Sequence, residues 1–421
     1  MRILFLTEIA DPGVGSSSRL TFQLARTLEA QGHQCAVVGA VQEGGEATPT
    51  EVQGISVFRL YSDYPVRFRA WRSLHNSFVD QPLEEILRDW QPDLVHAHLI
   101  HTHIGYHALT QAKRLGMAVV FTAHDVMTFC YQKLTCFHGG EEHGGQDFDV
   151  VARLSKCIPC QRFRFRPGRN RRILQVLERD VDRLTVVSDA LGEVLRMNQI
   201  HVHATVHNGL ALQESLPTAD EVAAFRRKHD LQDRQVLAIG GRLHTQKGVG
   251  KLIEMLALLV PKHPNLCLLV MGNAEVYNQE FLPQAEKLGV ADRVRTSGWL
   301  SGAELQHAYA AVDIFVTPSI CFDTFGMVNL EAMEHSKPVI ATSLGGSQEV
   351  VLDGETGFIA NPFDVPGFAG RIAELLGDPA RAQQMGAAGR LRLEDEFTIA
   401  SMAEAYLEQY NEALAEASNP I

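Results

Sequence analysis

The chain has 421 residues, of which 45% are hydrophobic and 21% are charged, and its formal net charge is −12. This length and composition suit two globular domains and exclude a disordered or fibrous protein. The acidic surplus argues against a nucleic-acid partner, because contacts with phosphates need a basic surface.

Short apolar segments alternate with helix-like segments through the first half of the chain. Such alternation predicts βαβ units and a parallel sheet. We therefore expect a Rossmann-like α/β domain over residues 1–208. Its strands are predicted at residues 3–7, 35–38, 55–60, 94–97, 119–123 and 184–187.

A loop with two glycines, DPGVGSSSR, lies between the first predicted strand and a predicted helix. A dinucleotide-binding fingerprint would need a third glycine where Ser18 stands and an acidic residue after the second strand. Neither is present, so the sequence disfavours a nicotinamide enzyme. Gly13 and Gly15 form either a loop that closes on a diphosphate or a simple strand-to-helix turn.

Four histidines crowd the end of a predicted strand in the run HAHLIHTH, residues 96–103. We assign no metal there, because no acidic or cysteine ligand is adjacent. His124 and Asp125 end the next strand, at the edge of the sheet where ligands of open α/β sheets bind. A histidine next to an aspartate at this edge can hydrogen-bond a ligand or assist a reaction.

A long insertion follows at about residues 126–170, and it holds four of the seven cysteines. An odd number of cysteines in a chain of this length fits a reducing compartment. The C-I-P-C spacing is typical of half a tetrahedral zinc site. A structural zinc, thiols and a disulfide therefore stand as alternatives for Cys130, Cys136, Cys157 and Cys160.

The segment RLSKCIPCQRFRFRPGRNRR, residues 153–172, holds eight Lys or Arg residues and no acidic residue. It is either a solvated loop or a surface that contacts an anionic acceptor or an anionic membrane. No stretch approaches the roughly 20 consecutive apolar residues that span a bilayer, and the N-terminus turns acidic after a single strand. We expect a cytoplasmic protein without a signal peptide, in peripheral contact with a membrane at most.

The strand pattern begins again after a polar stretch near residues 216–220. It predicts a second Rossmann-like domain over residues 209–395, and an amphipathic helix at residues 396–421 ends the chain. Two such domains would leave a cleft that faces the carboxyl ends of both sets of strands. The strands of the second domain are predicted at residues 236–240, 266–271, 294–296, 314–317 and 339–341.

Two basic residues follow the first strand of the second domain in the run IGGRLHTQKGVGKLIEML. Arg242 comes directly after the strand, and Lys247 precedes the next helix. Two cations at this point can neutralise a diphosphate that gains charge as it leaves a sugar. Gly272 and Leu300 follow later strands of the same predicted domain.

The run from TPSICFDTFG to GETGFIAN predicts a strand, loop, helix, strand, glycine turn, helix and short strand. Asp323 and Glu331 stand on either side of Phe325 and Gly326. Gly326 lets the backbone approach a ligand, and it opens a helix from Met327 whose first N–H groups can bind a diphosphate. Glu331 then lies about one and a half turns along, where its carboxylate either accepts both hydroxyls of a ribose or simply faces solvent.

These motifs resemble the retaining glycosyltransferases of family 4, or group 1, which have the GT-B architecture of two Rossmann-like domains. The family's Glu-x7-Glu element is met with Asp323 in its first position, one methylene shorter. The family's Gly-Arg-x5-Lys-Gly element has Arg242 and Lys247 in register. The resemblance implies that these cations stabilise the leaving group, that Glu331 holds the ribose, and that Asp323 and His124 hold the sugar.

The resemblance also implies that the first glycine loop borders the donor phosphates, that Leu300 borders the base and that the last helix packs on the first domain. A hexose would pass from UDP-glucose or a similar donor to the hydroxyl of a glycan, glycolipid or glycoside, in polysaccharide or glycolipid assembly. No catalytic metal or other cofactor is required, because the two cations supply the positive charge. A nucleotide-sugar epimerase and a non-catalytic protein that binds a UDP-sugar are the alternatives.

Overall fold

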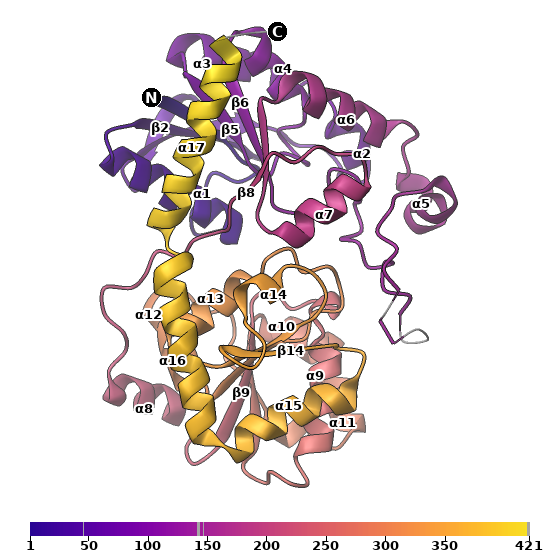
Figure 1. The fold of residues 1–421 in the computed structure, drawn as a ribbon, viewed down its shortest axis with the longest axis vertical. Helices are drawn as coiled ribbons and strands as arrows, with labels where there is room; N and C mark the ends of the chain where they lie inside the picture. The colour runs from indigo at the N-terminus through magenta and orange to yellow at the C-terminus, as the bar shows by residue number, and fades with distance from the viewer. Residues whose placement is uncertain (45, 141–143, 146, 419–421) are drawn as a thin grey trace. The chain divides into compact units, whose positions relative to one another are not determined.

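The computed structural model describes residues 1–44, 46–140, 144–145 and 147–418. The chain forms two compact units, each built around its own sheet (Figure 1). Unit 1 comprises Met1–Leu134, Val150–Ala211 and Thr398–Ile421, and unit 2 comprises Thr135–Asp149 and Leu212–Phe397. The prediction of two Rossmann-like domains is confirmed.

Eight strands form the sheet of unit 1, in the order β3-β4-β2-β1-β5-β6-β7-β8. Neighbouring strands run parallel except β3, which pairs antiparallel with β4. In the middle of the sheet Leu4 lies opposite Ala36 on one side and Val95 on the other. The strands are β1 (Arg2–Leu6), β2 (Gln34–Val41), β3 (Glu46–Val52), β4 (Ile55–Tyr61), β5 (Leu94–Ala97), β6 (Ala118–Ala123), β7 (Arg183–Val186) and β8 (Ala204–Thr205).

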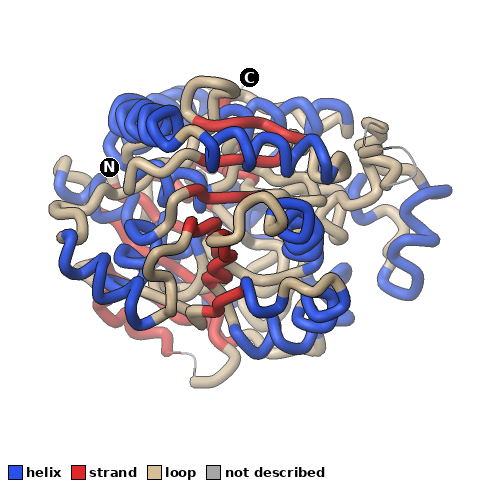
Figure 2. The backbone as a smooth tube through the Cα atoms, turned by 90° about the horizontal axis from the view of Figure 1, so that it is seen from below, coloured by secondary structure: helices blue, strands red, loops and turns tan. Residues whose placement is uncertain are grey.

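Helices cover both faces of this sheet, since every residue of β6 is buried and its side chains alternate between the faces. Figure 2 shows the strands in red with helices in blue on either side of them. The helices are α1 (Ser16–Ala30), α2 (Arg69–Arg72), α3 (Asp80–Trp90), α4 (His107–Arg114), α5 (Leu154–Gln161), α6 (Arg169–Asp180), α7 (Asp189–Met197) and α17 (Ile399–Ser418). Short 3₁₀ turns span Val66–Phe68 and Arg162–Arg164.

The last helix of the chain, α17, packs against α1, β6 and β7 of unit 1. Its Tyr406 and Tyr410 are fully buried. A hydrogen bond of 2.7 Å joins the Tyr410 hydroxyl to His96 Nδ1, and one of 3.1 Å joins the Tyr406 hydroxyl to Thr122. The C-terminal helix therefore supplies two large side chains to the core of the first unit.

The boundaries between the units differ from those expected at residues 208 and 395. Unit 1 extends to Ala211 and resumes at Thr398, because Leu210 pairs with Thr398 as an isolated parallel bridge. A Cβ at Gly209 would also overlap the Thr398 carbonyl group, so this close approach requires glycine.

Part of the insertion expected in the first domain at 126–170 belongs instead to unit 2, namely Thr135–Asp149. Phe137 is buried against Phe322, and the ring of His138 lies 4.6 Å from that of Phe363. His138 Nε2 also hydrogen-bonds the Ile320 carbonyl oxygen over 2.9 Å. Burial of these rings on unit 2 explains the assignment; residues 141–143 and 146 of the insertion lie outside the described residues.

Six parallel strands form the sheet of unit 2, in the order β11-β10-β9-β12-β13-β14. The first strand of this unit along the chain, β9, therefore lies in the middle of the sheet, next to the fourth strand of the unit, β12. The order reverses at this point, which makes it the topological switch point of the sheet. The strands are β9 (Gln235–Gly240), β10 (Leu266–Met271), β11 (Val294–Thr296), β12 (Ile314–Thr317), β13 (Val339–Thr342) and β14 (Gly357–Ala360).

The core of unit 2 lies between this sheet and its helices. All six residues of the run LCLLVM in β10 are buried, and Leu266, Leu268 and Val270 of this run form one apolar cluster with residues of α9 and α15. The helices are α8 (Ala219–Lys228), α9 (Val249–Leu259), α10 (Ala274–Glu280), α11 (Leu282–Lys287), α12 (Gly302–Ala311), α13 (Met327–Glu334), α14 (Ser347–Val350), α15 (Val365–Gly377) and α16 (Pro379–Glu396), with 3₁₀ turns at Thr245–Lys247 and Ala291–Arg293.

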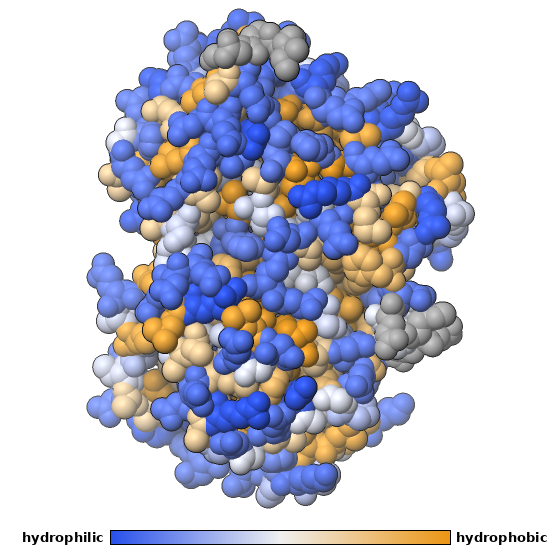
Figure 3. Space-filling model, in the orientation of Figure 1, coloured by the Kyte–Doolittle hydropathy of each residue, from blue (hydrophilic) through white to orange (hydrophobic). Residues whose placement is uncertain are grey.

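Every predicted strand is present, and the bounds agree within one or two residues except at the end of β2, which runs three residues further than expected, to Val41. The edge strand β3 of unit 1 was not predicted. The face in view in Figure 3 is mainly hydrophilic, with apolar residues in small groups. Among the helices of the described residues, none combines the length and the apolar character that crossing a bilayer requires.

Candidate functional site

The predicted residues of unit 2 lie at the carboxyl ends of neighbouring strands. Arg242 and Lys247 follow β9, Gly272 follows β10, Leu300 follows β11, and the segment from Asp323 to Glu331 follows β12. Because all six strands are parallel, these carboxyl ends share one edge of the sheet. The residues therefore gather at the edge where open α/β sheets bind their ligands.

The loop after β9 is held close to the loop after β10. The Gly241 N–H donates to the Met271 carbonyl oxygen over 3.0 Å, and Gly241 has a positive φ of 99°. A Cβ at Gly272 would approach within 2.8 Å of the Gly241 carbonyl oxygen. Packing against Gly241 is therefore sufficient to require glycine at position 272, whether or not Gly272 contacts a ligand. Arg242 follows these glycines with an exposed side chain, for which the described part of the chain supplies neither a hydrogen bond nor an ion pair.

Lys247 and Gly248 meet the loop that follows β12. Gly248 has a φ of 74° and begins α9, and a Cβ on it would overlap the Pro318 carbonyl oxygen. The Ile320 N–H donates to the Gln246 carbonyl oxygen over 2.9 Å. The two loops on either side of the switch point are therefore packed together backbone against backbone, which only glycine at position 248 permits.

Lys247 and Asp323, predicted separately, form an ion pair between these loops. Lys247 Nζ lies 3.4 Å from Asp323 Oδ2, and the Ser319 hydroxyl donates to the same oxygen over 3.1 Å. The Asp323 side chain is 7% exposed, whereas that of Lys247 is 42% exposed. The negative charge of Asp323 raises the pKa of Lys247 against the opposing effect of burial, so the ammonium group stays charged at neutral pH.

The backbone around Asp323 is fixed by the glycine turn after β13. The Asp323 N–H donates to the Leu344 carbonyl oxygen over 2.9 Å, and the Gly346 N–H donates to the Asp323 carbonyl oxygen over 2.7 Å. Gly345 has a φ of 108°, and a Cβ on it would overlap the Asp323 carbonyl group. Two adjacent turns thus hold the carboxylate of Asp323 beside Lys247.

The start of α13 combines a glycine with a buried polar network. Gly326 has a φ of 86°, and a Cβ on it would collide with the Asn329 amide. Asn329 is fully buried; its Oδ1 accepts from the Thr317 hydroxyl and its Nδ2 donates to the Ser347 hydroxyl. This network, which the sequence did not reveal, ties α13 to β12 and α14 and fixes the direction of the helix N-terminus.

Phe325 and Met327 flank Gly326 in different environments. The Phe325 side chain is 2% exposed and lies 6.0 Å, ring to ring, from Phe397. It is a core residue, so any contact with a donor would come from its backbone. Met327 is the first residue of α13 and is partly exposed, as is Leu300 before α12.

Glu331 lies on α13 and is oriented by a tyrosine of α12. The Tyr309 hydroxyl donates to Glu331 Oε2 over 2.6 Å. Tyr309 is 2% exposed and its ring stacks on His335 at an interplanar angle of 8°. Glu331 itself is partly exposed, so it keeps access to solvent while one oxygen is held in place. Tyr309 was missed by sequence reasoning, because an aromatic residue on a helix most often marks core packing.

In unit 1 the glycine loop follows β1 and leads into α1. The Gly13 N–H donates to Asp11 Oδ1 over 2.8 Å, and Gly15 adopts a φ of 81° directly before the helix. The Ser18 hydroxyl donates to the carbonyl oxygens of Ile9 and Asp11, each over 2.7 Å. Both glycines are exposed at the carboxyl end of β1, which a ligand loop and a simple turn both allow.

His124 and Asp125 contact two of the histidines from the run at 96–103. His124 Nε2 lies 2.7 Å from His98 Nδ1, and His101 Nε2 lies 3.3 Å from Asp125 Oδ1. Burial lowers the pKa of His124 to about 4, so its imidazole is neutral at physiological pH. These contacts hold His98 and His101 beside His124 and Asp125 at the carboxyl ends of β5 and β6.

The insertion contains helical structure and a buried arginine. Cys157 and Cys160 lie on α5, and Arg169 begins α6 with its side chain 4% exposed. Arg169 Nε donates to the Tyr131 hydroxyl over 2.5 Å, and its terminal nitrogens donate to the backbone of the preceding loop. Arg169 thus anchors the insertion rather than facing an anionic partner, whereas Phe163 of the same basic run is fully exposed.

The seven cysteines are present as thiols rather than disulfides. Within the described residues, the side chains that come close enough together to hold a metal ion are His75, Asp80 and His107, and no cysteine is among them. The four cysteines of the insertion thus do not converge on a common point in this conformation.

Comparison with known proteins identifies similar chains over both units. The family model described as "Glycosyl transferases group 1" matches residues 221–392, and the model described as "Glycosyltransferase Family 4" matches residues 17–214. A GDP-mannose-dependent alpha-(1-6)-phosphatidylinositol monomannoside mannosyltransferase of Mycolicibacterium smegmatis is 34% identical over 43% of this chain. That match spans 49% of the mannosyltransferase, about half of its length.

Other similar proteins match the chain over nearly its whole length. A glycogen synthase of Mycobacterium tuberculosis is 27% identical over 97% of this chain and 94% of its own. Among solved structures, a sucrose-phosphate synthase of Thermosynechococcus elongatus has a TM-score of 0.77 at 21% identity, covering 98% of this chain and 99% of that one. The Anabaena protein HepE in complex with UDP-glucose has a TM-score of 0.71 at 17% identity, covering 98% and 99%. The structural likeness confirms the GT-B fold.

Proposed function

Because this chain belongs to the group 1, family 4 glycosyltransferases, we propose that it is a retaining enzyme that moves a hexose from a nucleotide-diphosphate sugar to an acceptor hydroxyl. The donor in this proposal is UDP-glucose or a close relative. The observation that carries it is the Lys247–Asp323 ion pair at the switch point of the unit 2 sheet, beside the start of α13. A cation, a buried carboxylate and a helix N-terminus at one point suit a sugar diphosphate.

In the proposed arrangement the diphosphate lies between Lys247, Arg242 and the N-terminus of α13. The exposed guanidinium of Arg242 supplies a second positive charge after the same strand. The ribose hydroxyls are accepted by the Glu331 carboxylate, which Tyr309 already orients. Asp323 and His124 hold hydroxyls of the sugar, and Leu300 borders the base. Gly13 and Gly15 let the loop after β1 approach the phosphates.

The reaction proposed here breaks the bond between the anomeric carbon and the diphosphate oxygen, and the electron pair leaves with the diphosphate. The acceptor oxygen forms its new bond on the same face of the sugar, which retains the configuration. The acceptor proton passes to the departing diphosphate oxygen. Positive charge from Lys247 and Arg242 counts most when the diphosphate gains charge, so these residues lower the barrier rather than merely tighten binding.

Two features of similar proteins bear on the donor. HepE was crystallised with UDP-glucose, which supports a uridine nucleotide, whereas the mycobacterial mannosyltransferase is named for its use of GDP-mannose. The carboxylate of Asp323 is one methylene shorter than the glutamate of the family motif, so the donor hydroxyl that it contacts is held closer to the loop. We prefer UDP-glucose, and we expect the sugar to be decided at Asp323.

The acceptor in this proposal is a glycan, glycolipid or glycoside used in polysaccharide or glycolipid assembly. Exposed basic side chains of residues 153–172, among them Arg162 and Arg164 on either side of the fully exposed Phe163, suit peripheral contact with an anionic membrane. Co-sedimentation with phosphatidylglycerol vesicles but not with phosphatidylcholine vesicles would support this contact. If equal amounts of protein sedimented with both kinds of vesicle, the membrane contact would no longer be part of the proposal.

The experiment that tests the function measures nucleotide release from UDP-glucose, UDP-galactose, GDP-mannose and ADP-glucose, with and without a membrane extract, followed by mass analysis of the products. Release from one donor, together with a hexose mass added to an acceptor, is the expected result. Conversion of the donor without an acceptor would identify an epimerase instead. Binding of a nucleotide sugar without release under any condition would identify a non-catalytic protein.

A further inference from the structure

Unit 1 holds a cluster of two histidines and an aspartate that the proposed reaction does not use. His75 lies in the loop between α2 and α3, Asp80 is the first residue of α3, and His107 is the first residue of α4. One side-chain ligand atom from each residue lies within 4.8 Å of the others. His75 Nε2 hydrogen-bonds Asp80 Oδ2, and the rings of His75 and His107 meet edge to face with their centroids 4.7 Å apart.

Hydrogen bonds between the three segments fix the backbones of these residues. The His107 N–H donates to the Leu74 carbonyl oxygen over 3.2 Å, next to His75. The Tyr106 N–H donates to the Ser73 carbonyl oxygen over 2.7 Å. The Gln111 amide donates to the Asp80 carbonyl oxygen over 2.9 Å, which ties α4 to the start of α3.

A buried asparagine next to His75 holds this loop in place. Asn76 is fully buried, and its amide donates to the Ser62 hydroxyl over 2.9 Å. Gly105 has a φ of 87°, and a Cβ on it would lie 3.1 Å from the Arg72 carbonyl oxygen, so the loop approaches the start of α4 as closely as glycine allows. The three candidate ligands therefore stand on backbones that the fold has already positioned.

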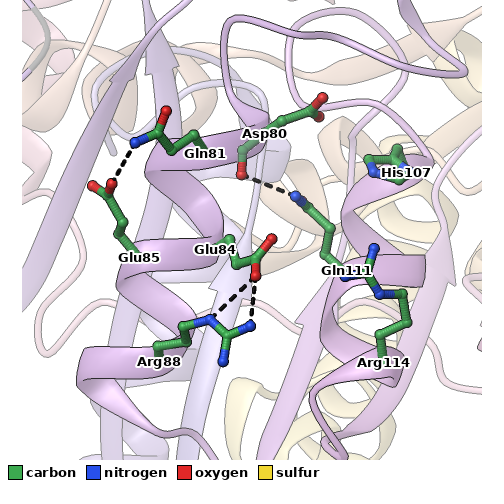
Figure 4. Close-up of a pocket in the computed structure, with 8 residues that line it drawn as sticks. All are labelled: Asp80, Gln81, Glu84, Glu85, Arg88, His107, Gln111 and Arg114. Carbon is green, nitrogen blue, oxygen red and sulfur yellow. Dashed lines mark hydrogen bonds and ion pairs between the residues drawn. The ribbon is translucent and has the colours of Figure 1, made fainter.

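Asp80 and His107 stand at one end of a groove of about 470 Å³ between α3 and α4 (Figure 4). Their side chains face one another across this end in Figure 4, while Glu84 and Arg88 line the groove further along α3. The His75 side chain is 57% exposed and that of Asp80 is 25% exposed, so an ion can reach the cluster from solvent.

From this geometry we propose that His75, Asp80 and His107 bind a divalent transition-metal ion, with Zn²⁺ as the best match. Two imidazole nitrogens and one carboxylate oxygen suit Zn²⁺, whereas Mg²⁺ and Ca²⁺ prefer oxygen ligands. Bonds of about 2.0–2.2 Å would place tetrahedral ligands roughly 3.3 Å apart. Binding would bring the three ligand atoms, now within 4.8 Å of one another, to this spacing by rotation of the side chains.

The bound ion would connect the loop Ser73–Val79 to the first residues of α3 and α4 and so stabilise this part of unit 1. This site lies within unit 1, at the starts of α3 and α4, and its role is independent of the proposed transfer reaction. A His75–Asp80 hydrogen bond that holds the loop to α3 without any metal is the alternative that an experiment must separate from it.

The test begins with the full-length protein stripped of metal by a chelator, into which Zn²⁺ is titrated in competition with a chromophoric chelator. One ion per chain is expected. His75→Ala and His107→Ala should each weaken its binding by about tenfold or more, the loss seen even for groups that only support a ligand. The matched control is His201→Ala, because His201 is also exposed and its ring lies 4.5 Å from that of His203.

Cobalt distinguishes this site from the cysteines of the insertion. Co²⁺ bound by nitrogen and oxygen gives weak visible absorption, whereas thiolate ligands add a strong band in the near ultraviolet. We expect the weak visible absorption of nitrogen and oxygen ligands in the wild-type protein, and its loss in His75→Ala. It is overturned if neither ion binds to the wild-type protein, or if binding persists unchanged in both histidine variants. His75 is exposed, so its replacement leaves the fold intact and keeps the test decisive.

Discussion

At the scale of single residues, we expect the positive charge of Lys247, which pairs with Asp323, to raise kcat. Lys247→Ala removes the cation proposed to stabilise the departing diphosphate, and the Asp323 carboxylate keeps its hydrogen bond from the Ser319 hydroxyl. We expect kcat to fall by about 10²–10³-fold, the loss seen when one preorganised donor to developing charge is removed. Steady-state assays with the donor identified by the panel measure this.

Lys262→Ala is the matched control for this substitution, because Lys262 is an exposed lysine of the same unit before β10. Its turnover should equal that of the wild type. A Lys247→Ala enzyme whose kcat stays within threefold of the wild type would show that the lysine only braces the loop. The raised pKa of Lys247 places the loss of its charge at alkaline pH, above the ordinary range of lysine, so activity near neutrality should not depend on its titration.

The neutral state of His124 gives a second prediction about a single side chain. Burial lowers its pKa to about 4, so between about pH 5.5 and 8 the folded protein does not titrate this group. His124→Asn should lower kcat by roughly tenfold through one lost hydrogen bond. The ratio of wild-type to variant activity should stay constant across this pH range. A ratio that changes with a midpoint near the ordinary histidine pKa would mean that His124 acts as a charged acid.

At the scale of elements, the contact between α12 and α13 positions Glu331. Tyr309→Phe removes the hydroxyl that donates to Glu331 and keeps the ring that stacks on His335. The lost hydrogen bond is worth about 1 kcal/mol, which corresponds to a roughly fivefold weaker affinity for the nucleotide. Isothermal titration with UDP measures it, and kcat at saturating donor should change little.

Tyr277→Phe is the control for this change, since the Tyr277 hydroxyl is buried without a hydrogen-bond partner among the described residues. Removing that hydroxyl should leave nucleotide affinity unchanged. If Tyr309→Phe binds UDP as tightly as the wild type, then Glu331 either needs no orientation or does not contact the ribose.

The segment Thr135–Asp149 contacts the loop that carries Asp323, which gives the insertion a role in the donor site. Phe137 is 1% exposed and packs on Phe322, and His138 bonds the Ile320 carbonyl oxygen. Phe137→Ala should release this segment and loosen the loop, so the donor KM should rise severalfold and the segment should become sensitive to protease. Phe163→Ala, at a fully exposed phenylalanine of the same insertion, should do neither. Equal protease sensitivity in both variants would refute the contact.

The sequence predicted elements best where a local pattern decides the structure. The run LCLLVM has to be a buried strand, and the glycines at 248 and 326 mark turns that no other residue can make without overlap. The edge strand β3 was missed because EATPTEV contains proline and mixes polar with apolar residues. Tyr309 and the placement of Phe137 were missed because both depend on contacts between residues far apart in the chain.

At the scale of the whole molecule, the division into two units predicts two unfolding transitions. Tyr406 of α17 is fully buried in unit 1, and Phe368 of α15 is 1% exposed in unit 2. Each truncation to alanine removes a large core side chain, which costs about 3–5 kcal/mol in the unit that contains it. Tyr406→Ala should therefore lower one midpoint in a calorimetric scan, and Phe368→Ala should lower the other.

A ligand provides an independent assignment of the two transitions. If the nucleotide binds unit 2, UDP at about 100 times its Kd should add about 2.7 kcal/mol to the stability of that unit alone. The transition that Phe368→Ala lowers should then be the one that UDP raises, while the transition sensitive to Tyr406→Ala stays in place. A single transition that both variants shift equally would show that the units unfold as one body. A rise in the Tyr406-sensitive transition alone would place the nucleotide on unit 1 and remove the role proposed for Glu331.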